Sequence, residues 1–186
     1  INGHGPGEMD ISYEPFLLFF GRLEAYKGVE YLLTAFAQAS SGNPTDYQLV
    51  LAGPGDLTKV WVGNLPARVE LRNRLITDVE ALDLFRRCSL VLLPYIDATQ
   101  SALIGSAYYF QKPVLVSRTG ALPEYVNTGE TGFIAEPGHP TTLTRALSAA
   151  LCEPERLPQM GRAGRQWYDQ QRVEEEEQLR ALYASF

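Results

Sequence analysis

The chain has 186 residues, of which 45% are hydrophobic and 20% charged, and this composition fits one globular domain of ordinary size. The formal net charge of -6 argues against a nucleic-acid-binding role, because such proteins need a clustered positive surface, and the nearest basic cluster is Arg68, Arg72 and Arg74. The longest apolar runs, 16–20 and 90–93, are too short to span a bilayer.

The N-terminal half of the chain alternates between strand and helix patterns. The apolar runs 16–20 and 47–52 predict strands buried on both faces, and 69–71 predicts a third, shorter strand. Apolar residues at helical spacing over 29–36 predict a helix between the first two strands. Residues 56–67 are expected to contain only a short, irregular helix.

The C-terminal half continues this alternation. Asp78 precedes a helical pattern that runs to Cys88, which predicts a helix with Asp78 as its N-cap. The stretch 101–110 is apolar around most of its circumference, so we expect a helix packed between other elements. Two or three further helices are expected to finish the chain. The remaining predicted strands are 90–93, 114–116 and 132–134.

This order predicts an α/β, Rossmann-like three-layer sandwich: a parallel sheet of about six strands, helices on both faces, and extra C-terminal helices. Ligands of such sheets bind outside the carboxyl ends of the strands, so functional residues are expected in the loops that follow them. Cys88 and Cys152 lie far apart without ligand-like spacing, which favours free thiols and a cytoplasmic location. Neither His4 nor His139 is assigned to catalysis.

Two cations follow the first predicted strand. Arg22 and Lys27 lie near the mouth of the sheet, just before a helix, where an anion would meet both charges and the positive end of the helix dipole. Charge alone favours the simpler interpretation that both are solvated surface side chains.

A second feature that could bind an anion is the segment 98–105, which contains the start of the apolar helix predicted over 101–110. The first backbone N–H groups of a helix lack partners within it and can bind a phosphate. Ser101 could cap the helix, or its hydroxyl could contact a ligand, and spacing alone does not separate these alternatives.

Six segments in register resemble a known family. They are Gly21–Arg22 with Lys27–Gly28, Leu51–Gly55, Leu92–Tyr95, Lys112–Val114, Gly120–Glu124 and Gly129–Phe133. Together they resemble the C-terminal, donor-binding domain of retaining glycosyltransferases of the GT-B fold (group 1, family 4), over roughly residues 16–170. The resemblance outweighs the interpretation of Arg22 and Lys27 as ordinary surface charges.

The resemblance implies roles for individual residues. Arg22 and Lys27 would be the catalytic pair, holding the diphosphate of a nucleoside-diphosphate sugar and stabilising the leaving group. Ile76 and Thr77 would contact the base, and backbone N–H groups at 101–103 would contact the phosphates. The full set of implied donor-binding residues is Gly21, Gly53, Pro54, Ile76, Thr77, Thr99, Gln100, Ser101, Ala102, Leu103 and Ser106.

The sequence departs from the family where many relatives carry two Glu residues with seven residues between them. The equivalent positions are Ala98 and Ser106, neither of them acidic. Gln100 and Ser106 could hydrogen-bond the sugar and the ribose instead, and a subgroup of the family carries Ala-Thr-Gln-Ser at the place of 98–101. The alternative is that donor binding has decayed, which the intact Arg22 and Lys27 disfavour.

We therefore expect a piece of a longer enzyme that transfers a hexose-type sugar with retention to a saccharide, lipid-linked or small-molecule acceptor, in polysaccharide biosynthesis for example. Residues 1–15 would be a flexible linker remnant and 16–186 the donor domain, inactive without its N-terminal acceptor domain. The C-terminal segment, with Trp167 and Tyr168, would cross back toward that domain and be partly exposed. The absence of an Asp-any-Asp motif predicts that no metal or cofactor takes part, and the parent could associate peripherally with a membrane.

Two other classes of function compete with this expectation. A non-catalytic nucleotide-binding or scaffolding module of the same fold is motivated by the missing acidic pair. A dinucleotide-binding dehydrogenase domain is disfavoured, because no Gly-x-Gly-x-x-Gly joins the first strand to its helix.

Overall fold

The structure is a computed structural model that describes residues 10–42 and 46–184. Within these ranges the chain forms six strands: β1 (Phe16–Phe20), β2 (Gln48–Ala52), β3 (Val69–Arg72), β4 (Leu90–Leu93), β5 (Val114–Ser117) and β6 (Gly132–Ala135). Its helices are α1 (Val29–Gly42), α2 (Asp78–Arg87), α3 (Ala102–Tyr109), α4 (Pro140–Cys152) and α5 (Leu157–Ala184). Short 3-10 helices are η1 (Ala25–Lys27), η2 (Leu57–Lys59), η3 (Leu122–Tyr125) and η4 (Pro154–Arg156).

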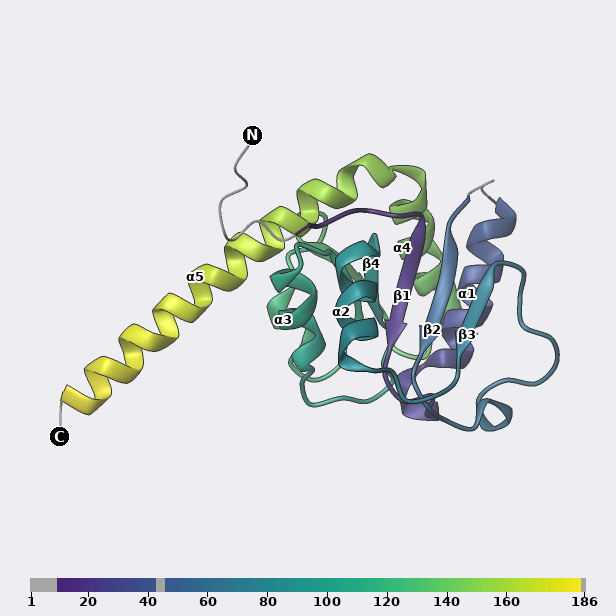
Figure 1. The fold of residues 1–186 in the computed structure, drawn as a ribbon, viewed down its shortest axis with the longest axis horizontal. Helices are drawn as coiled ribbons and strands as arrows, with labels where there is room; N and C mark the ends of the chain where they lie inside the picture. The colour runs from purple at the N-terminus through teal and green to yellow at the C-terminus, as the bar shows by residue number, and fades with distance from the viewer. Residues whose placement is uncertain (1–9, 43–45, 185–186) are drawn as a thin grey trace.

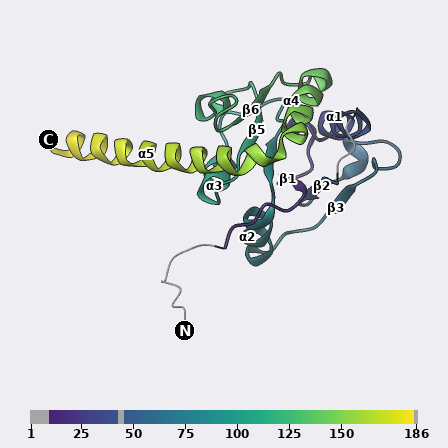
Figure 2. The ribbon, with the colours of Figure 1, turned by 90° about the horizontal axis from the view of Figure 1, so that it is seen from above.

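The strands pair in parallel in the order β3-β2-β1-β4-β5-β6. The helices α1 and α4 pack together on one face, and α2 and α3 lie on the other (Figures 1 and 2). This confirms the predicted three-layer α/β fold. The connections reverse direction between β1 and β4, and ligands of doubly wound sheets bind at such a switch point.

The strands form the core because their side chains are apolar on both faces. The side chains of β4 are all buried, as are those of 16–19 in β1. The short predicted strand at β6 and the irregular segment containing η2 are confirmed.

Two local predictions need correction. Thr77, not Asp78, is the N-cap of α2: its side chain accepts a hydrogen bond from the Glu80 N–H, and Asp78 occupies the first helical turn. The helix α3 is also less enclosed than its composition suggested. Its buried residues are Ile104, Ala107 and Tyr108, whereas 44% of Tyr109 is exposed, although Arg165 of α5 lies over its ring.

The segment before β1 is held against the domain. Glu14 accepts two hydrogen bonds from Arg87, at 2.7 Å each, and the Lys112 ammonium donates to the Ser12 carbonyl. The Tyr13 hydroxyl donates to the carbonyl of Gln111. This part of the expected flexible linker is therefore docked; residues 1–9 lie outside the described residues, and the division at residue 16 stays a prediction.

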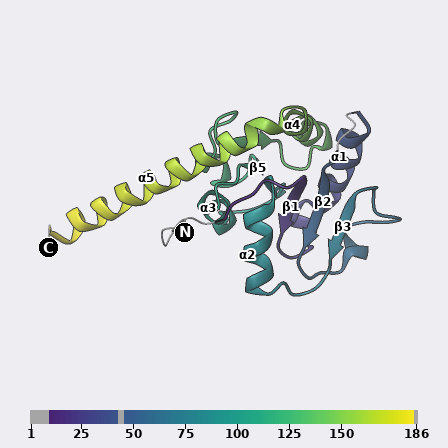
Figure 3. The ribbon, with the colours of Figure 1, turned by 45° about the horizontal axis from the view of Figure 1, so that its top comes forward.

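The extra C-terminal helix α5 has 28 residues. Its first half packs against α3, and its second half projects away from the domain (Figure 3). In that projecting half, Leu179 and Tyr183 are 53% and 75% exposed. Within the described residues no helix is long and apolar enough to cross a membrane.

Candidate functional site

The loops at the carboxyl edge of the sheet touch one another through backbone atoms. Gly53 has φ of 147°, and a Cβ there would lie 2.1 Å from the Gly21 carbonyl oxygen. The Leu23 N–H donates to the Pro54 carbonyl at 2.9 Å. The structure thus brings together Gly21, Gly53 and Pro54, whose expected role in donor binding stays a prediction. Gly53 is needed because any side chain would push the β1 and β2 loops apart.

Lys27 is fixed above a buried aromatic ring. Its Nζ lies 3.8 Å from the ring centroid of Tyr95, which follows β4 and is 1% exposed. The two loops are held at this distance by Gly28, where a Cβ would lie 1.9 Å from the Pro94 carbonyl oxygen. A cation over an aromatic face is stabilised by the ring quadrupole, so Lys27 is an ordered cation at the switch point.

Tyr95 links Lys27 to the start of α3. Burial raises the pKa of Tyr95, and the nearby Ser101 hydroxyl acts in the opposite direction. No group within the described residues completes a hydrogen bond of normal geometry to the Tyr95 hydroxyl. Tyr95 ends the family-like segment Leu92–Tyr95, but the sequence does not reveal a role for it, because a buried tyrosine after a strand is indistinguishable there from a core residue.

Arg22, the second predicted cation, is arranged differently. Its side chain is 74% exposed, and its nearest carboxylate oxygen, from Glu24, is 3.8 Å away. At this exposure the pair contributes little to stability. Arg22 therefore extends into solvent and is free to turn toward a ligand at the same edge.

Ser101 caps the start of α3. Ser101 has an extended backbone, and its Oγ accepts from the Leu103 N–H at 3.4 Å. The Ala121 N–H donates to the Thr99 carbonyl, which ties this loop to the one after β5. The side chains of Thr99 and Gln100 and the residue Ala102 are exposed.

Ser106 lies one turn into the same helix. Its hydroxyl donates to the Ala102 carbonyl at 3.3 Å, so it is already engaged within α3. Ala98, the other position where many relatives carry Glu, approaches Gly120 so closely that a Cβ on this glycine would lie 1.9 Å from the Ala98 carbonyl oxygen.

The loop between β3 and α2, with Ile76 and Thr77, is braced at both ends. Asn73 accepts a hydrogen bond from the Gly55 N–H at 3.0 Å. Glu80 accepts from Arg74 at 2.7 and 2.8 Å and from Arg72 at 3.0 Å. The Arg74 guanidinium, followed by that of Arg72, lowers the pKa of the Glu80 carboxyl.

The sequence did not predict this bracing, because Arg72 and Arg74 stood out there only as members of the nearest basic cluster. Both are paired with Glu80 and are not a free positive patch.

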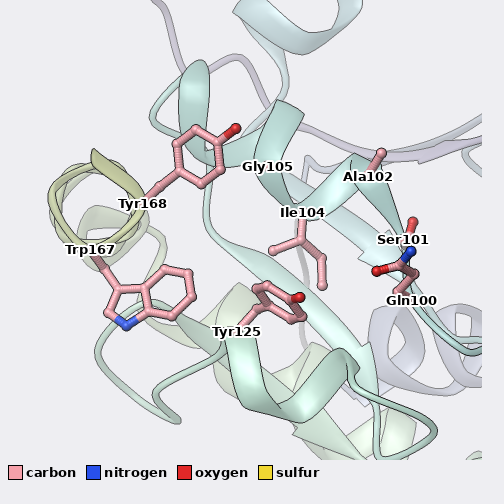
Figure 4. A pocket seen from close by; sticks show the side chains of 8 residues that line it. All are labelled: Gln100, Ser101, Ala102, Ile104, Gly105, Tyr125, Trp167 and Tyr168. Atoms are coloured by element: carbon pink, nitrogen blue, oxygen red, sulfur yellow. The ribbon is translucent and has the colours of Figure 1, made fainter. Parts of the chain in front are cut away.

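A pocket of about 290 Å³ lies beside the helix start, between α3, η3 and α5 (Figure 4). Its lining residues are Gln100, Ser101, Ala102, Ile104, Gly105, Tyr125, Trp167 and Tyr168. Trp167 and Tyr168 were expected to be partly exposed, and both are half-buried. The pocket shares Gln100, Ser101 and Ala102 with the predicted donor-binding set.

No ligand contact of any predicted residue is tested by the structure, so their binding and catalytic roles stay predictions. Within the described ranges, no three His, Cys, Asp or Glu side chains gather in a way that could hold a metal ion.

Comparisons with known proteins agree with this architecture. Residues 14–153 match the family model described as glycosyl transferases group 1. A D-rhamnosyltransferase, WbpZ of Pseudomonas aeruginosa, is 29% identical over 164 residues, which cover 83% of this chain and 41% of that protein. The chain spans about two fifths of the length of the first curated relatives it matches.

Solved structures share the fold. The Anabaena protein HepE in complex with UDP superimposes with a TM-score of 0.75 at 20% identity, covering 92% of this chain and 49% of that one. The C-terminal domain of a group 1 family glycosyl transferase (LpcC) from Francisella tularensis has a TM-score of 0.72 at 17% identity, covering 86% of this chain and 87% of that one.

Proposed function

We propose that this chain, which belongs to the group 1 glycosyltransferase family and corresponds to the C-terminal domain of its members, binds the nucleoside-diphosphate sugar donor of a retaining enzyme. The observation that carries the proposal is that, at the switch point of the sheet, the Lys27 ammonium lies over the Tyr95 ring and Tyr95 lies near Ser101. It places an ordered cation beside the N-terminus of a helix, and a diphosphate is stabilised by both.

Arg22 and Lys27 stabilise the leaving group. When the bond between the anomeric carbon and the diphosphate oxygen breaks, negative charge grows on that oxygen. Lys27 stabilises this charge from its place over Tyr95, and Arg22 turns from solvent to meet the same phosphates. The N–H groups at the start of α3 add donors. We propose that these groups serve in place of a metal cation.

The nucleotide base lies against the loop with Ile76 and Thr77, whose backbone is held by Asn73 and Glu80. HepE, of the same fold, has been solved with UDP and with UDP-glucose, which supports a nucleotide at the corresponding edge here. The donor sugar lies by Thr99 and Gln100, and we propose a hexose-type sugar in view of the rhamnosyltransferase relative.

Most of the acceptor site and the remaining catalytic groups come from the other half of the parent enzyme, so this chain alone does not transfer sugar. We propose a cytoplasmic parent, in keeping with the free thiols of Cys88 and Cys152.

Titration of the chain with UDP and GDP by calorimetry tests the donor site. Binding should weaken about tenfold or more in Arg22→Ala and in Lys27→Met, because each loses a charge-assisted contact to phosphate. Lys27→Met keeps an unbranched side chain over Tyr95. Arg180→Ala, an 82% exposed arginine in α5, is the matched control and should bind as the wild type does.

A non-catalytic scaffolding module of the same fold is the second candidate, favoured by Ala98 and by the engagement of the Ser106 hydroxyl within α3. It predicts no nucleotide affinity in this chain or in the full-length parent. Affinity that appears only in the full-length protein would instead mean that the donor site is completed by the other half.

A further inference from the structure

The pocket between α3, η3 and α5 is chemically unlike the proposed diphosphate site. The cations Arg22 and Lys27 belong to the β1 loop, whereas all the residues that line the pocket are uncharged. The two sites meet at Gln100 and Ser101, so the pocket opens directly beside the place proposed for the donor sugar (Figure 4). The side chains of this wall carry no charge, which favours a neutral ligand over an anion.

The polar groups of the pocket are those that bind hydroxyl groups. Tyr125, Trp167 and Tyr168 contribute aromatic rings, and Gln100 adds an amide. Among the described residues no side chain or backbone group pairs with the hydroxyls of Tyr125 and Tyr168 or with the indole N–H of Trp167. Aromatic rings with free polar ends suit a ligand that has both an apolar face and a hydroxyl rim. A pyranose ring has both.

The aromatic wall is held in place by its own packing. Trp167 packs edge-on against Tyr108, with ring centroids 6.0 Å apart, and against Tyr125, at 5.9 Å. The Tyr108 hydroxyl donates to the Tyr125 carbonyl at 2.8 Å. Gly105 leaves room for Tyr168, since a Cβ there would lie 3.1 Å from its ring. The wall therefore exists before any ligand arrives.

We propose that this pocket binds one pyranose ring of a saccharide acceptor, next to the donor sugar. The inference rests on the proposed function, which places a sugar donor beside Gln100. The volume of about 290 Å³ is at the lower end of the range for small-molecule sites, roughly 300–1,000 Å³, which limits the occupant to a single ring. The parent is then an enzyme that extends a saccharide, and α5 supplies part of its acceptor site.

Saturation-transfer NMR on the 186-residue chain tests this inference. The probes are the methyl glycosides of D-glucose, D-mannose and D-rhamnose, each with and without UDP. We expect transfer to the ring C–H protons of at least one glycoside, and the signal should persist when UDP is added. Gln100→Ala and Tyr125→Phe should weaken binding about fivefold each, the effect of one lost hydrogen bond. Trp167→Leu should abolish it.

Control variants distinguish binding at this pocket from nonspecific binding and from misfolding. Tyr183→Ala removes a 75% exposed aromatic residue from the far end of α5 and should leave the signal unchanged. Because Trp167 supports Tyr108, Trp167→Leu is interpreted only if its circular dichroism matches the wild type; the exposed residue Gln100 carries the test otherwise.

Three results would overturn the inference. They are no transfer to any glycoside, transfer that UDP displaces, and transfer that survives Gln100→Ala and Tyr125→Phe. UDP binding in the same samples is measured independently, so the donor proposal can stand while the acceptor pocket fails. Loss of UDP binding together with intact glycoside transfer would sink the donor proposal alone.

Discussion

Lys112 should make the stability of the domain rise between about pH 7 and pH 9. It is fully buried at the end of the turn after α3, its ammonium lies 3.8 Å from the Tyr13 ring centroid, and it donates to the Ser12 carbonyl. Burial lowers the pKa of Lys112 from 10.5 to about 8, although Cys88 and Glu14 act in the opposite direction. Above pH 8 the folded protein releases this proton before the unfolded chain does.

The sign and size follow from proton linkage. Where the unfolded chain binds more protons than the folded protein, stability increases with pH. For a group that titrates near 8 when folded and 10.5 when unfolded, the gain from pH 7 to pH 9 is about 1.3 kcal/mol. Cys88 has the opposite effect, which begins as the pH approaches 9, because burial raises its pKa from 9.0 to about 12. The effect of Lys112 is therefore read from the difference between the wild type and a variant that keeps Cys88.

The assay is urea unfolding of the wild type and of Lys112→Met, followed by circular dichroism at pH 7, 8 and 9. Methionine keeps an unbranched chain without the charge, so the other titrating groups nearly cancel in the difference between the two proteins. The unfolding free energy of the wild type, relative to the variant, should increase by about 1 kcal/mol across this range. If the difference in unfolding free energy between the two proteins stays constant or decreases with pH, the claim that the buried Lys112 ammonium loses its proton near pH 8 is refuted.

Two further substitutions, each with a control variant, test a loop contact and a helix cap. Gly28→Ala should destabilise the domain by about 2 kcal/mol or more in urea unfolding, because φ is 71° and the new Cβ would meet the Pro94 carbonyl oxygen. Gly63→Ala, with φ of 99° and nothing within 4 Å, should cost only about 1 kcal/mol; equal losses would mean that the backbone contact does not matter. Thr77→Ala should cost about 1 kcal/mol of unfolding free energy through loss of the cap on the Glu80 N–H, and Thr77→Ser should restore it.

The layers of the fold could be predicted because strands buried on both faces leave long apolar runs. The runs at 16–20 and 90–93 became β1 and β4 for this reason. The order of strands carries no such local signal, since it depends on which helices cover which face. The cap at Thr77 was misplaced by one residue because Thr77 and Asp78 are both good N-caps, and only backbone geometry distinguishes them.

For the candidate site, the family resemblance indicated residues but not their contacts. It implied donor-binding roles for Gly21, Gly53 and Pro54, and the structure adds that the backbones of their loops touch. The position of Tyr95 beneath Lys27 could not be predicted from the sequence, because it depends on the distance between two loops that are separated by nearly seventy residues. The aromatic pocket escaped prediction for the same reason, since Trp167 meets Tyr125 only when α5 folds back across α3.

The glycine contacts at the carboxyl edge also bear on how a ligand would be received. With the backbone of these loops in contact, little main-chain freedom remains to be lost on binding. Lys27 is already ordered over Tyr95, whereas Arg22 is 74% exposed and must surrender its rotamers, at about 1 kcal/mol for such a side chain. If the two cations bind a diphosphate as proposed, Arg22 loses more side-chain entropy on binding than Lys27 does, although they carry the same charge.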